Sequence, residues 1–214
     1  MKTINLFNSK LQISSYIIPI LLSSVLFYFL QYYVISYLII SAYISLFIHE
    51  LGHFLGAKVF KIKATKIYLG TTGGFTLFHK NVSFFQDFVI SISGSLLNAL
   101  AFLILLIVSK FFHIDYLFVK MLMYVNFVFI AELLPIMPLD GGRLIRVFYG
   151  NFMKDSFLEA TLKSYVFGFS FCITSIFLAL FLPISFISMM IYQILFLTLL
   201  FISYRSYLEF TKHA

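Results

Sequence analysis

Six nearly uncharged windows, each of roughly 18 to 24 residues, limit the folds open to this chain. A helix of about 20 apolar residues spans the hydrocarbon core of a bilayer, and each window is long enough to form one. With 62% hydrophobic and 11% charged residues, the chain is also too apolar for a soluble domain. The sequence therefore predicts an all-α polytopic membrane protein, with a single transmembrane domain over residues 1–214. The six predicted transmembrane helices cover residues 11–33, 34–57, 88–109, 116–134, 165–182 and 184–204.

The lysine and arginine residues follow the pattern of a membrane protein. If the amino terminus is cytosolic, six alternating helices place all 15 of them on the cytosolic side except Lys110 and Lys120. Basic residues are enriched in the cytosolic loops of membrane proteins, so this asymmetry indicates the orientation. We predict a multi-pass protein of the cell membrane with both termini cytosolic. The net charge of +7 is explained in this way, and no nucleic-acid partner is expected.

Two segments interrupt the apolar helices. The first, residues 61–86, contains Gly73 and Gly74 ahead of the β-prone run FTLF, which predicts a turn followed by a short strand. The second, ELLPIMPLDGGR at residues 132–143, carries two prolines and two glycines, so a regular helix cannot continue through it. Irregular backbone at membrane depth is tolerated only where protein or a water-filled cavity satisfies its polar groups. The second segment therefore indicates a cavity.

The second predicted helix contains the motif HExxH, formed by His49, Glu50 and His53. Residues four apart on a helix project from the same face, so both imidazoles can bind one zinc ion while Glu50 lies beside the open position of the metal. Zinc held by three protein ligands lowers the pKa of its bound water to about 7. We predict that this water is the nucleophile and that Glu50 is the general base. The alternative, polar contacts between helices, is disfavoured because three ionisable groups are costly inside a membrane.

A third zinc ligand is required, and the predicted topology nominates Asp140. The second and fourth predicted helices both end at the cytosolic side, which brings Asp140 to about the same depth as His49 and His53. Taken alone, the sequence PLDGG also fits a turn in which the aspartate caps the next helix. Beside an incomplete zinc site, we favour the ligand role.

HELGH in the second predicted helix and LLPIMPLDGGR after the fourth resemble the motifs of the site-2 protease family of intramembrane zinc metalloproteases. The resemblance implies that His49, His53 and Asp140 bind one zinc ion and that Glu50 is catalytic. It implies an endopeptidase that cuts a membrane-embedded or membrane-associated protein near the cytosolic half of the bilayer.

Within that family, the chain resembles the six-span sporulation branch, which processes a pro-sigma factor. A transcription-factor precursor as the substrate and a bacterial source are therefore expected. The resemblance also implies that the region of Gly73 and Gly74 forms a small membrane-embedded β element between the second and third helices. A substrate added to this element as an extra strand would be held extended for cleavage.

Two positions depart from the family pattern. Glu132 stands where relatives commonly have asparagine, and it is either a protonated hydrogen-bond donor or an additional metal ligand. In the segment GSLLN, Ser95 replaces a proline, and Asn98 either lines the cavity or packs between helices. The candidate cavity or substrate-binding residues are Glu132, Asn98, Gly73 and Gly74.

The other polar residues are interpreted as structural. Asp87 opens the third predicted helix and is expected to cap it. Arg143 and Arg146 are expected to anchor the chain at the membrane interface or to contact the cytosolic tail of a substrate. Cys172, the only cysteine, is expected to be a small core residue.

Partners and regulation can also be anticipated. Many relatives carry a PDZ-type domain or a nucleotide-sensing module, neither of which is expected here, so control by partner membrane proteins is anticipated. An alternative function of another class is a zinc-containing membrane scaffold that binds partners without hydrolysis. A carboxylate from Glu132 would close the zinc site in that case, and counting the zinc ligands separates the two functions.

Overall fold

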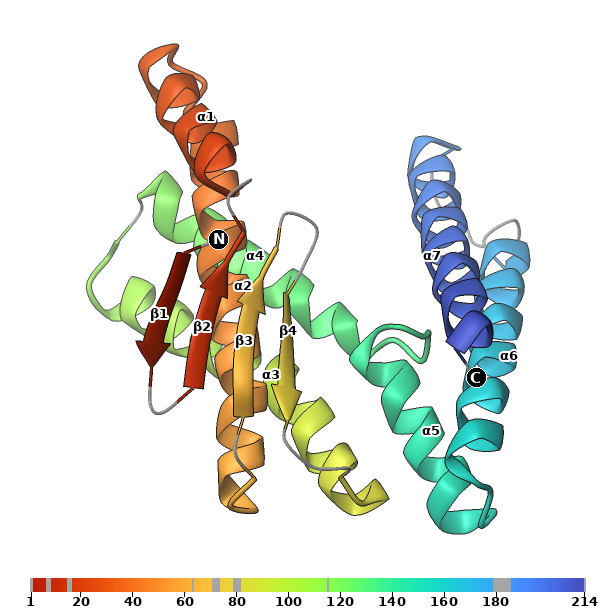
Figure 1. The fold of residues 1–214 in the computed structure, drawn as a ribbon. Helices are drawn as coiled ribbons and strands as arrows, with labels where there is room; N and C mark the ends of the chain where they lie inside the picture. Colours follow the sequence, from red (N-terminus) through yellow and green to blue (C-terminus); the bar gives the residue numbers. More distant parts are fainter. Residues whose placement is uncertain are drawn as a thin grey trace. The chain divides into compact units, whose positions relative to one another are not determined.

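The computed structural model describes residues 2–6, 9–14, 17–62, 64–70, 74–78, 82–114, 116–178 and 186–213. Within these ranges the chain is mostly helical, as predicted. It forms two compact units, Met1–Val82 with Ile92–Ala131 and Ser83–Ser91 with Glu132–Ala214, and the expectation of a single domain stays a prediction. Figure 1 labels the elements, which are β1 (Lys2–Leu6), β2 (Ser9–Ile13), α1 (Ile17–Phe29), α2 (Tyr33–Val59), β3 (Ala64–Leu69), β4 (Gly74–Phe78), α3 (Phe84–Phe111), α4 (Leu117–Val128), the 3₁₀ helix η1 (Phe129–Leu133), α5 (Asp140–Phe152), α6 (Phe157–Leu178) and α7 (Phe186–His213).

The first unit contains a four-stranded sheet with the strand order β1-β2-β3-β4. β1 and β2 form an antiparallel hairpin, β2 pairs with β3 in parallel, and β3 pairs with β4 antiparallel. The short strand predicted between the second and third helices is confirmed as β4, and Tyr68 of β3 stacks on its partner Phe75. The β element is thus larger than predicted, because the N-terminal hairpin extends it.

This N-terminal hairpin corrects the start of the first predicted transmembrane helix. Residues 11–13 belong to β2, and α1 begins only at Ile17. α1 has 13 residues and a length of about 20 Å, which is shorter than the roughly 30 Å hydrocarbon core of a bilayer. A window of hydropathy cannot distinguish an apolar strand from an apolar helix, so the window combined β2 with a short helix.

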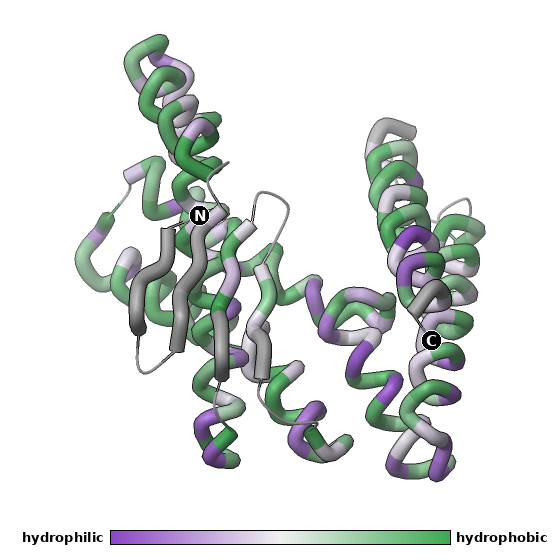
Figure 2. The backbone as a smooth tube through the Cα atoms, viewed as in Figure 1, coloured by the Kyte–Doolittle hydropathy of each residue, from purple (hydrophilic) through white to green (hydrophobic). Residues whose placement is uncertain are grey.

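Four helical segments are long and apolar enough to cross a membrane, Tyr33–Val59, Phe84–Phe111, Phe157–Leu178 and Met190–Thr211. They correspond to the second, third, fifth and sixth predicted helices. Since α1 and the 12-residue α4 are shorter, six spans are not confirmed among the described residues. Figure 2 shows α1 and the upper part of α2 as mostly hydrophobic, with hydrophilic residues toward the end of α2 that carries Lys58 in its last turn.

The core of the first unit lies between α2 and the sheet. β3 and β4 pack against α2, and the buried side chains of Leu46 and Phe54 on α2 cluster with Ile67 and Leu69 on β3. Ile67 and Leu69 are two residues apart in a strand, so they point to the same face of the sheet. Figure 1 shows the sheet lying along α2. This packing holds the sheet beside the part of α2 that carries the HExxH motif.

The second unit consists of α5, α6 and α7 with the first turns of α3. α5 packs on α6, and α6 packs on α7. The sequence does not predict α5 as a separate helix, because the prolines before it and the glycines at its start favour a turn. Ile136, Cys172 and Phe196 form the buried core of this unit, which confirms the expectation that Cys172 is a small core residue.

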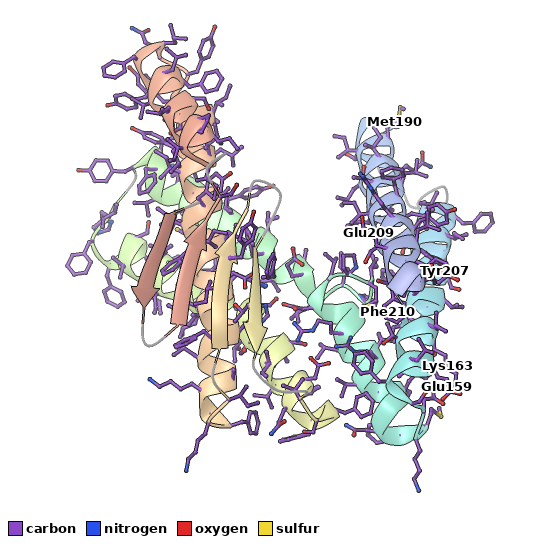
Figure 3. The ribbon with its side chains drawn as sticks, viewed as in Figure 1. Glu159, Lys163, Met190, Tyr207, Glu209 and Phe210 are labelled. Atoms are coloured by element: carbon purple, nitrogen blue, oxygen red, sulfur yellow. The ribbon has the colours of Figure 1, made fainter. Side chains whose placement is uncertain are left out.

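Aromatic side chains join the last two helices of the second unit. The ring of Tyr165 on α6 lies 5.5 Å from that of Tyr207 and 6.0 Å from that of Phe210 on α7, centroid to centroid. Figure 3 labels Tyr207 and Phe210 on α7. The hydroxyl of Tyr165 also forms a hydrogen bond of 2.7 Å with Ser206. The ring contacts and the hydrogen bond fix the pairing of α6 with α7.

Candidate metal centre

His49 and His53 lie on one face of α2, as their spacing predicts. Their Nε2 atoms are 3.1 Å apart, and both side chains are buried. Two nitrogen ligands of one tetrahedral zinc ion, each about 2.0 to 2.1 Å from the metal, lie roughly 3.3 Å apart. The observed separation therefore fits two imidazoles that share one ion. Phe129 packs against the ring of His49 with the centroids 5.6 Å apart, which gives the pair an apolar neighbour.

Glycine residues on α2 and α3 make room for the two imidazole rings. A Cβ atom at Gly94 would lie 2.6 Å from Cε1 of His53 and 2.9 Å from Cε1 of His49. A Cβ atom at Gly52 would lie 2.4 Å from the carbonyl oxygen of Ser93. All three separations are shorter than any ordinary van der Waals contact, so α3 can approach the motif this closely only with glycine at these positions.

The carboxylate of Glu50 is held by the edge strand β4. Thr76 Oγ1 donates a hydrogen bond of 2.8 Å to Glu50 Oε2, and Glu50 is only 3% exposed. A Cβ atom at Gly74 would lie 2.8 Å from Cγ of Glu50, so the first residue of β4 packs directly on this side chain. A hydrogen bond to the charged form of a carboxylate stabilises that form and fixes its orientation. The strand thus orients the predicted general base.

Asn98 joins three helices of the first unit. Its Nδ2 donates hydrogen bonds of 3.0 Å to the carbonyl oxygen of Ser45 on α2 and to Oδ1 of Asn126 on α4. Asn126 in turn donates a hydrogen bond to the carbonyl oxygen of Leu122. The side chain of Asn98 is fully buried. These contacts agree with the alternative in which Asn98 packs between helices. The other alternative, in which Asn98 lines a cavity, stays a prediction.

Asp140 belongs to the second unit, where it is buried and is the first residue of α5. The two glycines that follow it have a steric function. A Cβ atom at Gly141 would lie 2.1 Å from the carbonyl oxygen of Leu133, and one at Gly142 would lie 2.5 Å from the backbone nitrogen of Met137. The irregular segment before α5 therefore folds against the first turn of that helix, and this fixes the position of Asp140 within its unit.

Arg143 lies one turn after Asp140 and contacts its carboxylate. Nη1 of Arg143 donates a hydrogen bond of 3.3 Å to Asp140 Oδ1. Burial would lower the pKa of Arg143, but the carboxylates of Asp87 and Asp140 more than offset this effect and raise the pKa above its ordinary value. Asp140 therefore has a permanent cation beside it.

Two further predicted residues are less constrained by the structure. Glu132 lies in η1 and is partly buried, and its two readings as a donor or as an additional ligand stay predictions. Gly73 lies outside the described residues.

Two residues with direct contacts to the motif, Thr76 and Gly94, were not assigned a role from the sequence. In the sequence, Thr76 stands out only as part of the β-prone run FTLF, and Gly94 only as part of the segment GSLLN. The contacts of both residues depend on segments that are distant in sequence, so no local pattern identifies them. The β-prone run beside a zinc motif was the one available signal for Thr76.

Comparisons with known proteins agree with this geometry. Residues 37–116 match the model of peptidase family M50, and this range includes HExxH and Asn98 but ends before Asp140. A zinc metalloprotease of Methanocaldococcus jannaschii is 33% identical over 123 residues, which make up 56% of this chain and 35% of that relative. The solved structure of the site-2 protease from the same organism is similar with a TM-score of 0.61 and 26% identity, covering 94% of this chain and 93% of that one.

The four long apolar helices and the structural match agree with each other. They identify a membrane protein. The chain is thus similar to a site-2 protease over nearly its whole length and to peptidase family M50 over residues 37–116.

Proposed function

We propose that the protein is an intramembrane zinc endopeptidase in which His49, His53 and Asp140 bind one zinc ion. Each of the three offers one ligand atom, an imidazole nitrogen or a carboxylate oxygen, and all three side chains are buried. Two histidines and a carboxylate leave one position of a tetrahedral ion open, which is typical of catalytic rather than structural zinc sites. Asp140 lies beyond the matched family range, so its role rests on the LDGG motif and on its own chemistry.

The bound zinc would activate water and polarise the carbonyl group of the substrate. Glu50 acts as the general base: its carboxylate accepts the proton lost by the attacking water and returns it to the leaving amine. The hydrogen bond from Thr76 holds the carboxylate of Glu50 in one orientation. Burial of the motif excludes bulk water, which strengthens these electrostatic interactions.

The substrate class follows from the position of β4. β4 is at one edge of the described sheet, and its residues Gly74 and Thr76 contact Glu50. An extended peptide that pairs with this edge would pass beside the catalytic residue with its amide groups accessible, which a helix does not allow. We infer a membrane-embedded or membrane-associated protein substrate, cut near the cytosolic half of the bilayer in a multi-pass enzyme with cytosolic termini. The sporulation-branch resemblance favours a transcription-factor precursor.

One observation supports this proposal most strongly. The Nε2 atoms of His49 and His53 lie 3.1 Å apart on α2, and Glu50 between them is buried and accepts a hydrogen bond from Thr76. A purely structural pair of histidines would not need Glu50 to be oriented by a separate strand. A scaffold would also gain nothing from an open position on the metal.

The test separates metal binding from hydrolysis. Wild-type protein is reconstituted in liposomes with a library of single-span reporter proteins, and cleavage products are identified by mass spectrometry. Glu50→Gln should retain one zinc ion per chain and lose at least about 10²-fold in cleavage rate. Glu209→Gln makes the same change at an exposed position of α7 and should behave as wild type. Cleavage by Glu50→Gln at the wild-type rate would exclude Glu50 as the base.

Asp140 is tested by metal analysis. Asp140→Asn should lower the affinity for zinc, because an amide is a poorer ligand than a carboxylate. Asp155→Asn removes another carboxylate of the second unit, one that pairs with Lys163, and serves as the control. An unchanged zinc affinity in Asp140→Asn would contradict the ligand role.

A further inference from the structure

A buried carboxylate that the proposed chemistry does not use lies in the second unit. Asp87, in the first turn of α3, is 2% exposed and accepts hydrogen bonds from two arginines of α5. Nη2 of Arg143 lies 2.6 Å from Oδ1, and Nη2 of Arg146 lies 2.5 Å from Oδ2. The guanidinium of Arg146 also lies 4.6 Å from the ring centroid of Phe157. These arginines form ion pairs inside the protein, which differs from the expected anchoring at the membrane interface.

Asp87 is not needed as a helix cap, although the sequence favoured that role. Ser83 and Gln86 already cap α3: the amide of Gln86 donates to the hydroxyl of Ser83, and the amide of Ser83 donates to the side chain of Gln86. A buried carboxylate is costly unless it is paired. Its presence here therefore has a function other than starting the helix.

Arg143 connects Asp87 to Asp140. Its Nη2 contacts Asp87, while its Nη1 donates to Oδ1 of Asp140 at 3.3 Å. The guanidinium is planar, so the positions of its two terminal nitrogens are fixed relative to each other. An arginine held by Asp87 on one nitrogen thus holds the carboxylate of Asp140 on the other. Arg146 has the same anchor but no contact with Asp140 among the described interactions.

We propose that Asp87 and Arg143 are positioning residues for the metal, in which Asp87 fixes Arg143 and Arg143 orients the carboxylate of Asp140. This proposal rests on the proposed function, because it requires Asp140 to be a zinc ligand. A carboxylate that accepts a hydrogen bond on one oxygen can bind a metal through the other, and such outer partners restrict its rotation. Loss of an outer partner typically lowers metal affinity by about 10- to 100-fold.

The experiment compares the two arginines in the full chain, purified in detergent. Zinc affinity is measured by competition with a chromophoric chelator, and unfolding of the zinc-free protein is measured separately. Arg143→Gln should weaken zinc binding by about 10- to 100-fold. Arg146→Gln removes a pair with the same Asp87 and should bind zinc as tightly as wild type. Both variants should unfold at similar temperatures without zinc, since each loses its ion pair to Asp87 and one further contact, with Asp140 for Arg143 and with the ring of Phe157 for Arg146.

A third variant tests whether the shape of the Arg143 guanidinium or only its positive charge matters for zinc binding. Arg143→Lys keeps the positive charge, and with it the neutralisation of Asp87, but it cannot contact two carboxylates with a rigid fork. It should fold as wild type and still bind zinc about tenfold more weakly. Wild-type zinc affinity in both Arg143 variants would overturn the proposal, as would an equal loss in Arg146→Gln.

The variant Asp140→Asn distinguishes this inference from the proposed function. If Asp140→Asn binds zinc normally, the ligand assignment itself is wrong. If Asp140→Asn loses zinc while both Arg143 variants retain it, the ligand assignment holds and only the positioning role is wrong.

Discussion

Replacing Gly94 by alanine should disrupt zinc binding. The added Cβ would lie 2.6 Å from Cε1 of His53, whereas ordinary contact begins at 3.4 Å, so this ring must move by about 0.8 Å. The ring of His49, with Cε1 at 2.9 Å, must move by about 0.5 Å. Zinc sites tolerate deviations of about 0.2 Å in ligand distance. We therefore expect a loss of roughly 100-fold in zinc affinity and a comparable loss in cleavage rate.

The matched control for this variant is Gly168→Ala. Gly168 lies inside α6. The heavy atom nearest to a Cβ at this position would be Cα of Ile136, at 3.2 Å. Both substitutions should favour the helix by up to about 1 kcal/mol, because glycine is a poor helix former. The difference between the two variants in a zinc competition assay therefore reports the displacement of the rings. Equal zinc affinity in Gly94→Ala and Gly168→Ala would refute the steric argument.

Two further predictions concern the first unit. Thr76→Val removes the donor to Glu50 and should lower the cleavage rate by about 10- to 100-fold with zinc content unchanged, since a hydrogen bond to a charged group contributes about 1.5 to 3 kcal/mol. Thr76→Ser keeps the hydroxyl and should restore the rate, and a fully active Thr76→Val would exclude the positioning role. Asn98→Leu removes two interhelical hydrogen bonds and should destabilise the protein by roughly 1 kcal/mol in an unfolding titration with a denaturing detergent. The exposed neighbour substitution Leu96→Ala is its control, and equal stability of the two variants would contradict the packing role.

The HExxH motif was the part of the site that sequence could predict, because its geometry is local. A helix of fixed pitch brings His49 and His53 to one face whatever surrounds it. The short strand after Gly73 was also predictable, since β-prone residues follow a turn signal. The positions of Thr76 and Gly94 beside the motif depend on how distant segments pack, which a single sequence does not encode in any local pattern.

The sequence does not predict the N-terminal hairpin or α5, and the reasons differ. β2 is defined by its pairing with β3, about 55 residues away along the chain, and strand formation depends strongly on such neighbours. The apolar end of β2 falls in the same hydropathy window as α1, so the two elements look like one helix in the sequence. α5 begins within a segment rich in proline and glycine, and those residues indicated a turn. The structure shows that Gly141 and Gly142 instead belong to the helix and make room for the backbone of residues 133–137.

The contact of Gly52 with Ser93 also bears on how water reaches the site. α2 and α3 touch backbone to backbone there, with no side chain between them that could rotate to open a passage. We expect these two helices to move together as a rigid pair. Entry of water and release of products would then depend on displacement of β4, in which Thr76 donates a hydrogen bond of 2.8 Å to Glu50. Arrival of a substrate strand at that edge would thereby also control the access of water to Glu50.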